Sequence, residues 1–524
     1  MKSAACDVVS FFLEKEILIS PDIIKEPNFK DLINRYNQII EKIKSDDFLI
    51  LGKEIYYLLD NPAEIDINWQ DLEKSKAMLE RGADNGSYGR FIDYLSKEQP
   101  APQQEKAVKI VSSYDGQPKK RGIQDFVFYF NARFKAIESI LRNRQELQNI
   151  TTINRILNKK ERENVSIAAL ISSKHLTKNG NIMLSVEDPT GTVNVLISKN
   201  KPDLFSMANS LVLDEVIGIS GVSGENIIFA NNVIQPDIPT NKTLKKHSEE
   251  IYAIFLSDIH VGSNNFLSDD FNKFISWIRG EVGSDKQKDL AKKVKYIFIA
   301  GDLVDGCGIY PGQDKELVIK DVYKQYEACA NLLQQIPKDI NIIISPGNHD
   351  ALRIAEPQPR FYQDFSEPFY RLENATLVSN PAMVNVCSSK TFSGFDVLLY
   401  HGYSFDYFVA NVESLRNRGG YDRADLIMKF LLKRRHLAPS HTSTLYLPEV
   451  DVDPLVITKI PDFFVTGHVH KSIVANYRGV TLICGSCWQS KTSFQERVGH
   501  NPQPSRVPLV NLKTRDVKIL RFGG

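Results

Sequence analysis

The stretch Ile342-Ile343-Ile344-Ser345-Pro346-Gly347-Asn348-His349-Asp350 decides the fold. Its first four residues suit a buried strand, and the Pro-Gly pair that follows is a turn signal. An amide, an imidazole and a carboxylate come directly after the turn. Because open α/β sheets bind ligands at the carboxyl ends of their strands, we interpret this stretch as one contribution to a ligand site.

Four further apolar runs end in side chains of the same kind. The five runs and the residues after them are 252–256 before Asp258 and His260, 296–300 before Asp302, 342–344 before Asn348 and His349, 397–400 before His401, and 463–466 before His468 and His470. Five of the ten histidines therefore follow apolar strands, which unrelated surface histidines would not do. The amphipathic segments 271–279 and 320–333 predict helices that cover the sheet.

The chemistry of these strand ends predicts a metal site. Five histidines, two aspartates and an asparagine carry suitable groups, and we interpret His349 as acting on a phosphate. The seven candidate ligands are then Asp258, His260, Asp302, Asn348, His401, His468 and His470. Imidazole and oxygen ligands without thiolates favour manganese and leave iron, zinc and nickel open. Seven ligands are too many for one tetrahedral site. They predict two divalent ions bridged by a carboxylate, an arrangement that holds both the attacking and the leaving oxygen of a phosphoester.

Composition limits the other possibilities. A chain of 524 residues is long enough for two to four domains of about 100 to 200 residues each. Its 65 basic and 64 acidic residues give a net charge of +1, so any nucleic-acid or membrane surface must be local. Six scattered cysteines exclude a secreted disulfide scaffold. No apolar run reaches the roughly 18 to 20 residues of a membrane helix, and the first 20 residues carry charges that a signal peptide lacks, so we expect an intracellular protein.

The amino-terminal part of the chain predicts a small helical domain over residues 1–80. Apolar residues recur at helical spacing over 32–43, and a second apolar cluster covers 48–59. This apolar stripe is either core or a docking face for another protein. Residues 81–120 are rich in turn residues and poor in apolar ones, which predicts a flexible linker.

A barrel is predicted over residues 121–243. An amphipathic helix at 126–141 leads into five short alternating strands, at 165–171, 182–186, 193–197, 216–222 and 227–229. This pattern is typical of a small barrel of the oligonucleotide/oligosaccharide-binding (OB) type. Its few aromatic residues favour a structural or subunit-docking role over independent strand binding. The strand-end motifs lie in the remaining domain, residues 250–524.

One basic run leaves two interpretations open. Lys433-Arg434-Arg435, with His436 and His441, would line a substrate channel or form a solvated helix face. We favour the solvated face, which is the commoner explanation of a charge run.

The five motifs, in this order, resemble those of the calcineurin-like metallophosphoesterase superfamily, in particular its double-strand-break-repair nuclease branch. A closer resemblance, to the small, proofreading subunits of archaeal D-family DNA polymerases, is carried by residues 300–306, 310–313, 346–351, 355–359 and 485–489. The resemblance implies a multidomain α/β protein with a small helical domain, an OB-type barrel and a carboxyl-terminal calcineurin-like phosphoesterase sandwich.

The resemblance also implies a role for each site residue. It assigns Asp258, His260 and His470 to one metal and Asn348, His401 and His468 to the other, with Asp302 bridging them. His349 and Asp350 are implied to be catalytic. His349 would stabilise the developing charge or protonate the departing 3' oxygen, and Asp350 would orient it.

The expected function is a manganese-dependent 3'–5' exonuclease that proofreads DNA within a replicative polymerase of two subunits and supports the large one. Its expected partners are the large catalytic subunit, a single-stranded primer 3' end and, through the holoenzyme, the sliding clamp; no membrane partner is expected. The location implied is the cytoplasm of an archaeal cell, at the nucleoid. Two alternatives remain: a stand-alone phosphoesterase for small esters, and a structural B-subunit scaffold with weak or vestigial activity.

Overall fold

The computed structural model of the chain describes residues 2–14, 18–19, 32–35, 50–51, 107–116, 119–147, 149–159, 161–449, 451–497 and 499–523. The chain forms two compact units, residues 1–104 and residues 105–524. In the first unit, helix α1 (Lys2–Leu13) is followed by strand β1 (Leu18–Ile19), which pairs in parallel with β2 (Ile50–Leu51). The predicted helical stripe over 32–43 and the cluster over 48–59 lie mostly outside the described residues, so the domain predicted for 1–80 stays a prediction.

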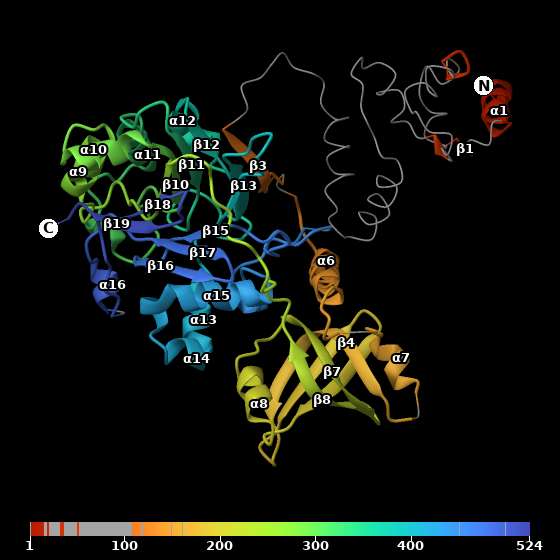
Figure 1. Cartoon of the computed structure of the whole chain (residues 1–524). Helices are drawn as coiled ribbons and strands as arrows, with labels where there is room; N and C mark the ends of the chain where they lie inside the picture. The colour runs from red at the N-terminus through yellow and green to blue at the C-terminus, as the bar shows by residue number, and fades with distance from the viewer. Residues whose placement is uncertain are drawn as a thin grey trace. The chain divides into compact units, whose positions relative to one another are not determined.

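The second unit contains a closed barrel of five strands (Figure 1). They are β4 (Asn164–Leu176), β5 (Ile182–Asp188), β6 (Gly191–Ile197), β7 (Val216–Gly224) and β8 (Ile227–Ile234). Their order around the barrel is β4-β5-β6-β8-β7, and β7 pairs with β4 to close it. Isoleucine, valine and leucine side chains that alternate along the strands fill the interior. A five-stranded barrel at this place in the chain confirms the predicted architecture.

Two six-stranded sheets form the remainder of the unit. The first has the order β12-β11-β10-β9-β18-β19 and the second the order β16-β17-β15-β14-β13-β3. The strands are β3 (Val108–Ser113), β9 (Tyr252–Leu256), β10 (Val294–Ala300), β11 (Asn341–Ser345), β12 (Ala375–Leu377), β13 (Ala382–Val386), β14 (Phe395–Leu399), β15 (Phe463–Thr466), β16 (Ser472–Tyr477), β17 (Val480–Gly485), β18 (Arg506–Asn511) and β19 (Val517–Arg521). The five strands that carry the motifs are therefore divided between two sheets.

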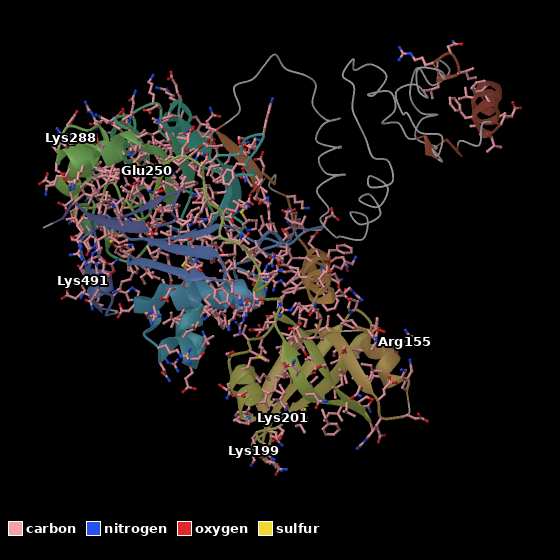
Figure 2. All side chains as sticks on the ribbon, viewed as in Figure 1. Arg155, Lys199, Lys201, Glu250, Lys288 and Lys491 are labelled. Carbon is pink, nitrogen blue, oxygen red and sulfur yellow. The ribbon has the colours of Figure 1, made fainter. Side chains whose placement is uncertain are left out.

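The two sheets pack face to face between layers of helices (Figure 1). Apolar residues of both sheets, including Phe255 and Phe463, form the central core. The first sheet is covered by α9 (Ser268–Ile278), α10 (Asp285–Lys292), α11 (Val322–Leu333) and α12 (Gln363–Tyr370). The second is covered by α13 (Phe405–Asn411), α14 (Glu413–Arg416) and α15 (Ala424–Arg434). Charged side chains such as Glu250 and Lys288 point outward (Figure 2), and none of the described helices is long and apolar enough to cross a membrane.

The predicted linker, residues 81–120, contains a strand that the sequence did not indicate. Strand β3 pairs antiparallel with β13 and forms the edge of the second sheet. Most of its side chains are exposed or half-exposed, so it carries no apolar alternation. Its pairing partner lies far away along the chain, and a local pattern cannot reveal such a pairing.

The basic run 433–436 has neither of the environments proposed for it. Arg434, Arg435 and His436 are almost completely buried. Arg434 makes an ion pair with Glu215 of the barrel at 2.8 Å, and His436 lies 2.8 Å from Asp453. These residues form neither a solvated face nor a channel lining, because each reaches a polar partner distant in the sequence.

Candidate metal centre

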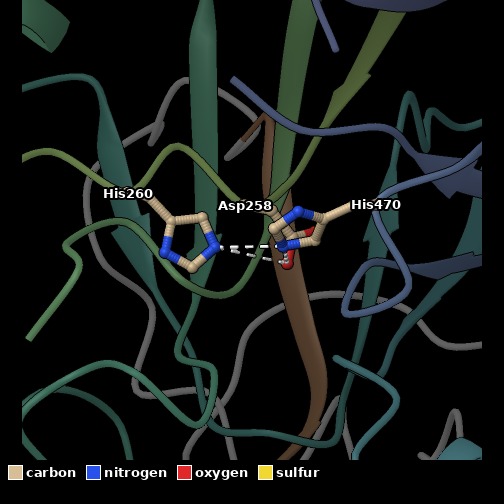
Figure 3. Close-up of side chains that lie close together, drawn as sticks. All are labelled: Asp258, His260 and His470. Atoms are coloured by element: carbon tan, nitrogen blue, oxygen red, sulfur yellow. Dashed lines mark hydrogen bonds and ion pairs between the residues drawn. The ribbon is translucent and has the colours of Figure 1, made fainter. Parts of the chain in front are cut away.

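Side chains that follow β9 and β15 form the first ligand cluster. Asp258, His260 and His470 point toward one another (Figure 3). The Nε2 atoms of the two histidines are 3.1 Å apart, and His470 Nε2 lies 3.4 Å from an Asp258 oxygen. All three side chains are buried. Their ligand atoms are close enough together to hold one ion.

A second cluster joins residues that follow β11, β14 and β15. The Asn348 amide oxygen lies 3.0 Å from His401 Nε2 and 3.0 Å from His468 Nδ1. Asp302 Oδ2 lies 3.1 Å from His401 Nε2 and 3.9 Å from His260 Nε2 in the first cluster. The Asp302 carboxylate is therefore the group that connects the two clusters. The structure thus brings together all seven of the residues predicted as ligands.

The backbone at these positions has an unusual conformation. Five of the seven residues have a positive φ, between 52° and 68°: Asp258, His260, Asp302, His468 and His470. Residues other than glycine adopt this left-handed region sparsely, and such positions cluster at functional sites. Gly347 shows how crowded the turns are, because a Cβ added there would overlap the Asp302 carboxylate. The turn residues thus determine where the ligand side chains lie.

Each histidine of the two clusters also has a partner on its second ring nitrogen. His260 Nδ1 lies 3.1 Å from Asp305, and His401 Nδ1 lies 2.8 Å from the Ala300 carbonyl. His468 Nε2 lies 2.9 Å from Asp406, and His470 Nδ1 lies 2.9 Å from the Gln495 amide. Such partners fix the tautomer and the orientation of a metal-binding imidazole. Sequence reasoning missed these four, although Asp305 lies within a motif that it singled out.

His349 and Asp350 have different surroundings from those predicted. His349 Nδ1 lies 2.9 Å from the Asp305 carbonyl, and its ring packs edge-on against His260. The Asp350 carboxylate instead accepts hydrogen bonds from the backbone N–H groups of Asp302 and Gly347 at 3.0 and 2.8 Å. The prediction that Asp350 orients His349 is therefore wrong. Asp350 ties two ligand turns together, and a backbone carbonyl holds His349.

Burial and like charge perturb the acids of this centre. Burial and the adjacent charge of Asp302 together raise the pKa of Asp350 to about 7. Burial acts in the same direction on Asp302, but His401, His349 and His260 outweigh it and hold its pKa well below the usual range. Burial alone would lower the pKa of His401, but Asp302, Asp258 and the Ala300 carbonyl together raise it to about 10. The carboxylates thus favour the protonated form of His401. Bound cations would neutralise the same carboxylates.

The donor set fits divalent metal ions. Three carboxylate or amide oxygen ligands and four imidazoles converge in a buried site, and no thiolate is among them. Their second ring nitrogens are already occupied, which leaves one nitrogen of each imidazole for a metal. A sandwich of two sheets with such ligands at the strand ends is the arrangement expected of a metal-dependent phosphoesterase domain. The sequence profile of the calcineurin-like phosphoesterase family matches residues 252–472.

Comparison with curated proteins identifies relatives that match nearly the whole chain. It is 34% identical to the DNA polymerase II small subunit of Methanothermobacter thermautotrophicus, over 98% of this chain and 99% of that protein. It is also 34% identical to the Pyrococcus furiosus small subunit, over 95% and 86% of the two chains, and 38% identical to that of Archaeoglobus fulgidus, over 80% and 81%. The chain belongs to the family of DNA polymerase II small subunits. This confirms the closer resemblance, which was carried by residues 300–306, 310–313, 346–351, 355–359 and 485–489.

Proposed function

We propose that this chain is a 3'–5' exonuclease that removes mismatched nucleotides from a DNA primer end, as the smaller of the two subunits of a D-family polymerase. The observation that carries the proposal is the convergence of seven donor side chains beside one further imidazole, that of His349. Family membership supplies the DNA context. The partner we infer is a large polymerising subunit, with a sliding clamp reached through the complex.

We assign each ligand to one of two cations. Asp258, His260 and His470 would hold the first, and Asn348, His401 and His468 the second, with Asp302 between them. Manganese suits this mixture of imidazole and oxygen ligands, and iron, zinc and nickel are the other candidates. Two such ions would supply positive charge to a phosphodiester. They would also lower the pKa of a water molecule toward neutrality, so that hydroxide is available as the nucleophile.

His349 is the residue that we assign to the substrate. Its Nδ1 is engaged by the Asp305 carbonyl, which leaves Nε2 for another partner. Its side chain is 17% exposed, whereas the side chain of His401 is 0% exposed. In its protonated form His349 would donate a hydrogen bond to a phosphate oxygen or a proton to the departing 3' oxygen. Asp350 would act indirectly, by holding the turns that carry Asp302 and Asn348.

We assign the barrel to the OB type, on the order of its five strands. Its interior is filled by aliphatic residues and it offers few aromatic side chains for stacking bases. We infer that it supports the large subunit through docking rather than by binding a strand independently.

The test is the release of mononucleotides from an end-labelled single strand in the presence of manganese. His349→Ala should lower the rate constant by about 10² to 10⁴-fold while the variant still binds two equivalents of metal. His175→Ala is the matched control, because it removes an exposed imidazole on the barrel. Co-purification with a large polymerase subunit from native extract tests the partner.

Three results would count against the proposal. No mononucleotide release by the wild-type chain would favour the structural scaffold with a vestigial site. Hydrolysis of small phosphoesters without hydrolysis of DNA would favour a stand-alone phosphoesterase. Equal nuclease activity in His349→Ala would remove the catalytic role of His349.

A further inference from the structure

A cavity of about 330 Å³ opens beside the candidate metal centre. Two of its lining residues, Val469 and Lys471, lie on either side of His470 in the chain. Its other walls come from the segment around α14 and the short helix η4 (Gly420–Arg423), and from residues 499–501. Small-ligand pockets have volumes of about 300 to 1,000 Å³, so this cavity suits a single small group such as one nucleoside.

An aromatic pair forms one wall of the cavity. The rings of Tyr421 and His500 lie with their centroids 4.2 Å apart and their planes inclined at 54°. Both residues are half-buried, so part of each ring stays accessible. Tyr421 also interacts with Asp406, the carboxylate that contacts His468. The wall is therefore linked to the candidate metal centre through a single side chain.

The charged lining of the cavity is positive overall. Lys471 is only 7% exposed and forms an ion pair with Asp422. Arg416 is exposed, and its guanidinium donates a hydrogen bond to the Ala410 carbonyl at 2.6 Å. The lining thus contains two cations and one carboxylate. Aromatic rings for a base combined with cations for a phosphate are the means by which proteins bind single-stranded nucleic acid.

We propose that this cavity binds the base of a nucleotide adjoining the scissile phosphate, against the rings of Tyr421 and His500, with Lys471 and Arg416 near the backbone phosphate. The inference rests on the proposed nuclease function and deepens it. A base can enter the cavity only after it has left its complement, and unpairing costs least at a mismatch. The cavity would therefore select unpaired primer ends at the cleavage step itself.

The test compares intact single strands with strands that lack one base, either at the 3' terminus or at the penultimate position. Stacking of one base on an aromatic side chain corresponds to roughly 5- to 150-fold in binding. For the full chain with manganese, kcat/KM should fall by a factor in this range when one of the two bases is missing. In His500→Ala the ratio of intact to abasic strand should approach one. His500→Phe, which keeps a ring, should restore the ratio.

His247→Ala is the matched control, because it removes an imidazole that is half-buried, as His500 is, but packs against Phe392 instead. It should keep the wild-type ratio. Equal cleavage of the intact strand and both abasic strands by the wild-type chain would overturn the base subsite and leave the nuclease intact. No manganese-dependent cleavage of any strand would instead overturn the proposed nuclease, and the subsite with it. The wild-type comparison needs no variant, so a folding defect in His500→Ala does not weaken the test.

Discussion

Asp305→Asn should weaken metal binding at the candidate centre, although Asp305 is not one of the seven proposed ligands. The Asp305 side chain is fully buried. Its Oδ1 lies 3.1 Å from His260 Nδ1 and accepts a hydrogen bond from Gln489 at 2.8 Å, and its Oδ2 accepts one from Gln313 at 2.9 Å. Burial alone would raise the pKa of this carboxyl, but His260 holds it below its usual value.

The size of the effect follows from these contacts. An asparagine side chain has one acceptor oxygen and one NH2 group, so in either orientation its NH2 would face the donor group of Gln313 or Gln489. A buried donor without an acceptor costs about 1 to 3 kcal/mol. Loss of a partner that orients a metal-binding imidazole typically costs about 10- to 100-fold in metal affinity. We expect a loss in this range at the cation held by Asp258, His260 and His470.

The assay is a calorimetric titration of the metal-free chain with manganese. Asp305→Asn should show one weakened site and one site close to wild type, because the imidazoles of the second cluster are held by the Ala300 carbonyl and Asp406 instead. Asp314→Asn is the control, since it makes the same substitution at an exposed acid in the same segment. Two manganese sites of wild-type affinity in Asp305→Asn would refute the argument that Asp305 orients His260.

Three further predictions follow from the structure. Gly347→Ala should abolish metal-dependent hydrolysis, measured with a phosphodiester substrate, because the added Cβ would displace the Asp302 carboxylate. Arg434→Ala should destabilise the contact between the barrel and the sheets by about 3 to 5 kcal/mol in thermal unfolding, because it leaves the charge of Glu215 buried and unpaired. Lowering the pH from about 6.5 to 4 should reduce the free energy of unfolding by roughly 3 kcal/mol. In His436→Gln the free energy of unfolding, measured across the same pH range, should fall less.

The sign of the pH effect comes from the surroundings of His436. Burial, reinforced by Arg133, lowers its pKa in the folded chain to about 4 against the opposing effect of Asp453. His436 therefore becomes protonated near pH 6.5 in the unfolded chain but only near pH 4 in the folded chain. Because the unfolded chain binds the extra proton in this range, stability falls as pH falls. Both ring nitrogens are already engaged, because Nδ1 accepts from the Ala438 N–H and Nε2 faces Asp453. If the free energy of unfolding of His436→Gln fell with pH as steeply as that of the wild type, this account would be contradicted.

Matched controls separate the other two effects from general damage. Gly308→Ala also adds a methyl group to a loop near the centre. It strains a backbone with a φ of 79°, but the space around Gly308 is open, so the ligands stay in place and hydrolysis should survive. Arg142→Ala breaks an exposed pair with Glu138, and such pairs contribute at most about 1 kcal/mol. Equal losses in Arg142→Ala and Arg434→Ala would show that burial of the barrel contact is not what matters.

The strands that carry the site could be predicted because buried strands are short, uninterrupted apolar runs. The observed β9 and β15 have the predicted bounds, and β10, β11 and β14 differ by one or two residues. The exposed edge strand β3 has no such run and was predicted as linker. The partners of the ligands were missed for a related reason. Asp406 lies 62 residues from His468, and only the folded chain brings the two together.

The burial of the basic run 433–436 could not be predicted from the sequence pattern either. Arg434, Arg435 and His436 read as a solvated helix face because a local pattern contains no information about distant acids. In the folded chain Arg434 pairs with Glu215, and Arg435 donates to the carbonyls of Ile457 and Thr458 at 2.7 and 2.6 Å. A buried cation is tolerated only with partners of this kind. The burial of three consecutive basic residues thus marks an internal junction, the contact between the barrel and the rest of the unit.

Helix α15 connects this junction to the proposed base subsite. Its amino-terminal end follows η4, whose Tyr421 and Asp422 line the cavity, and its carboxyl-terminal end supplies Arg434 to the barrel. One face of the helix packs on the second sheet, which anchors it beside the strands that carry His401 and His468. The wall of the cavity and the contact with the barrel therefore lie at opposite ends of one helix.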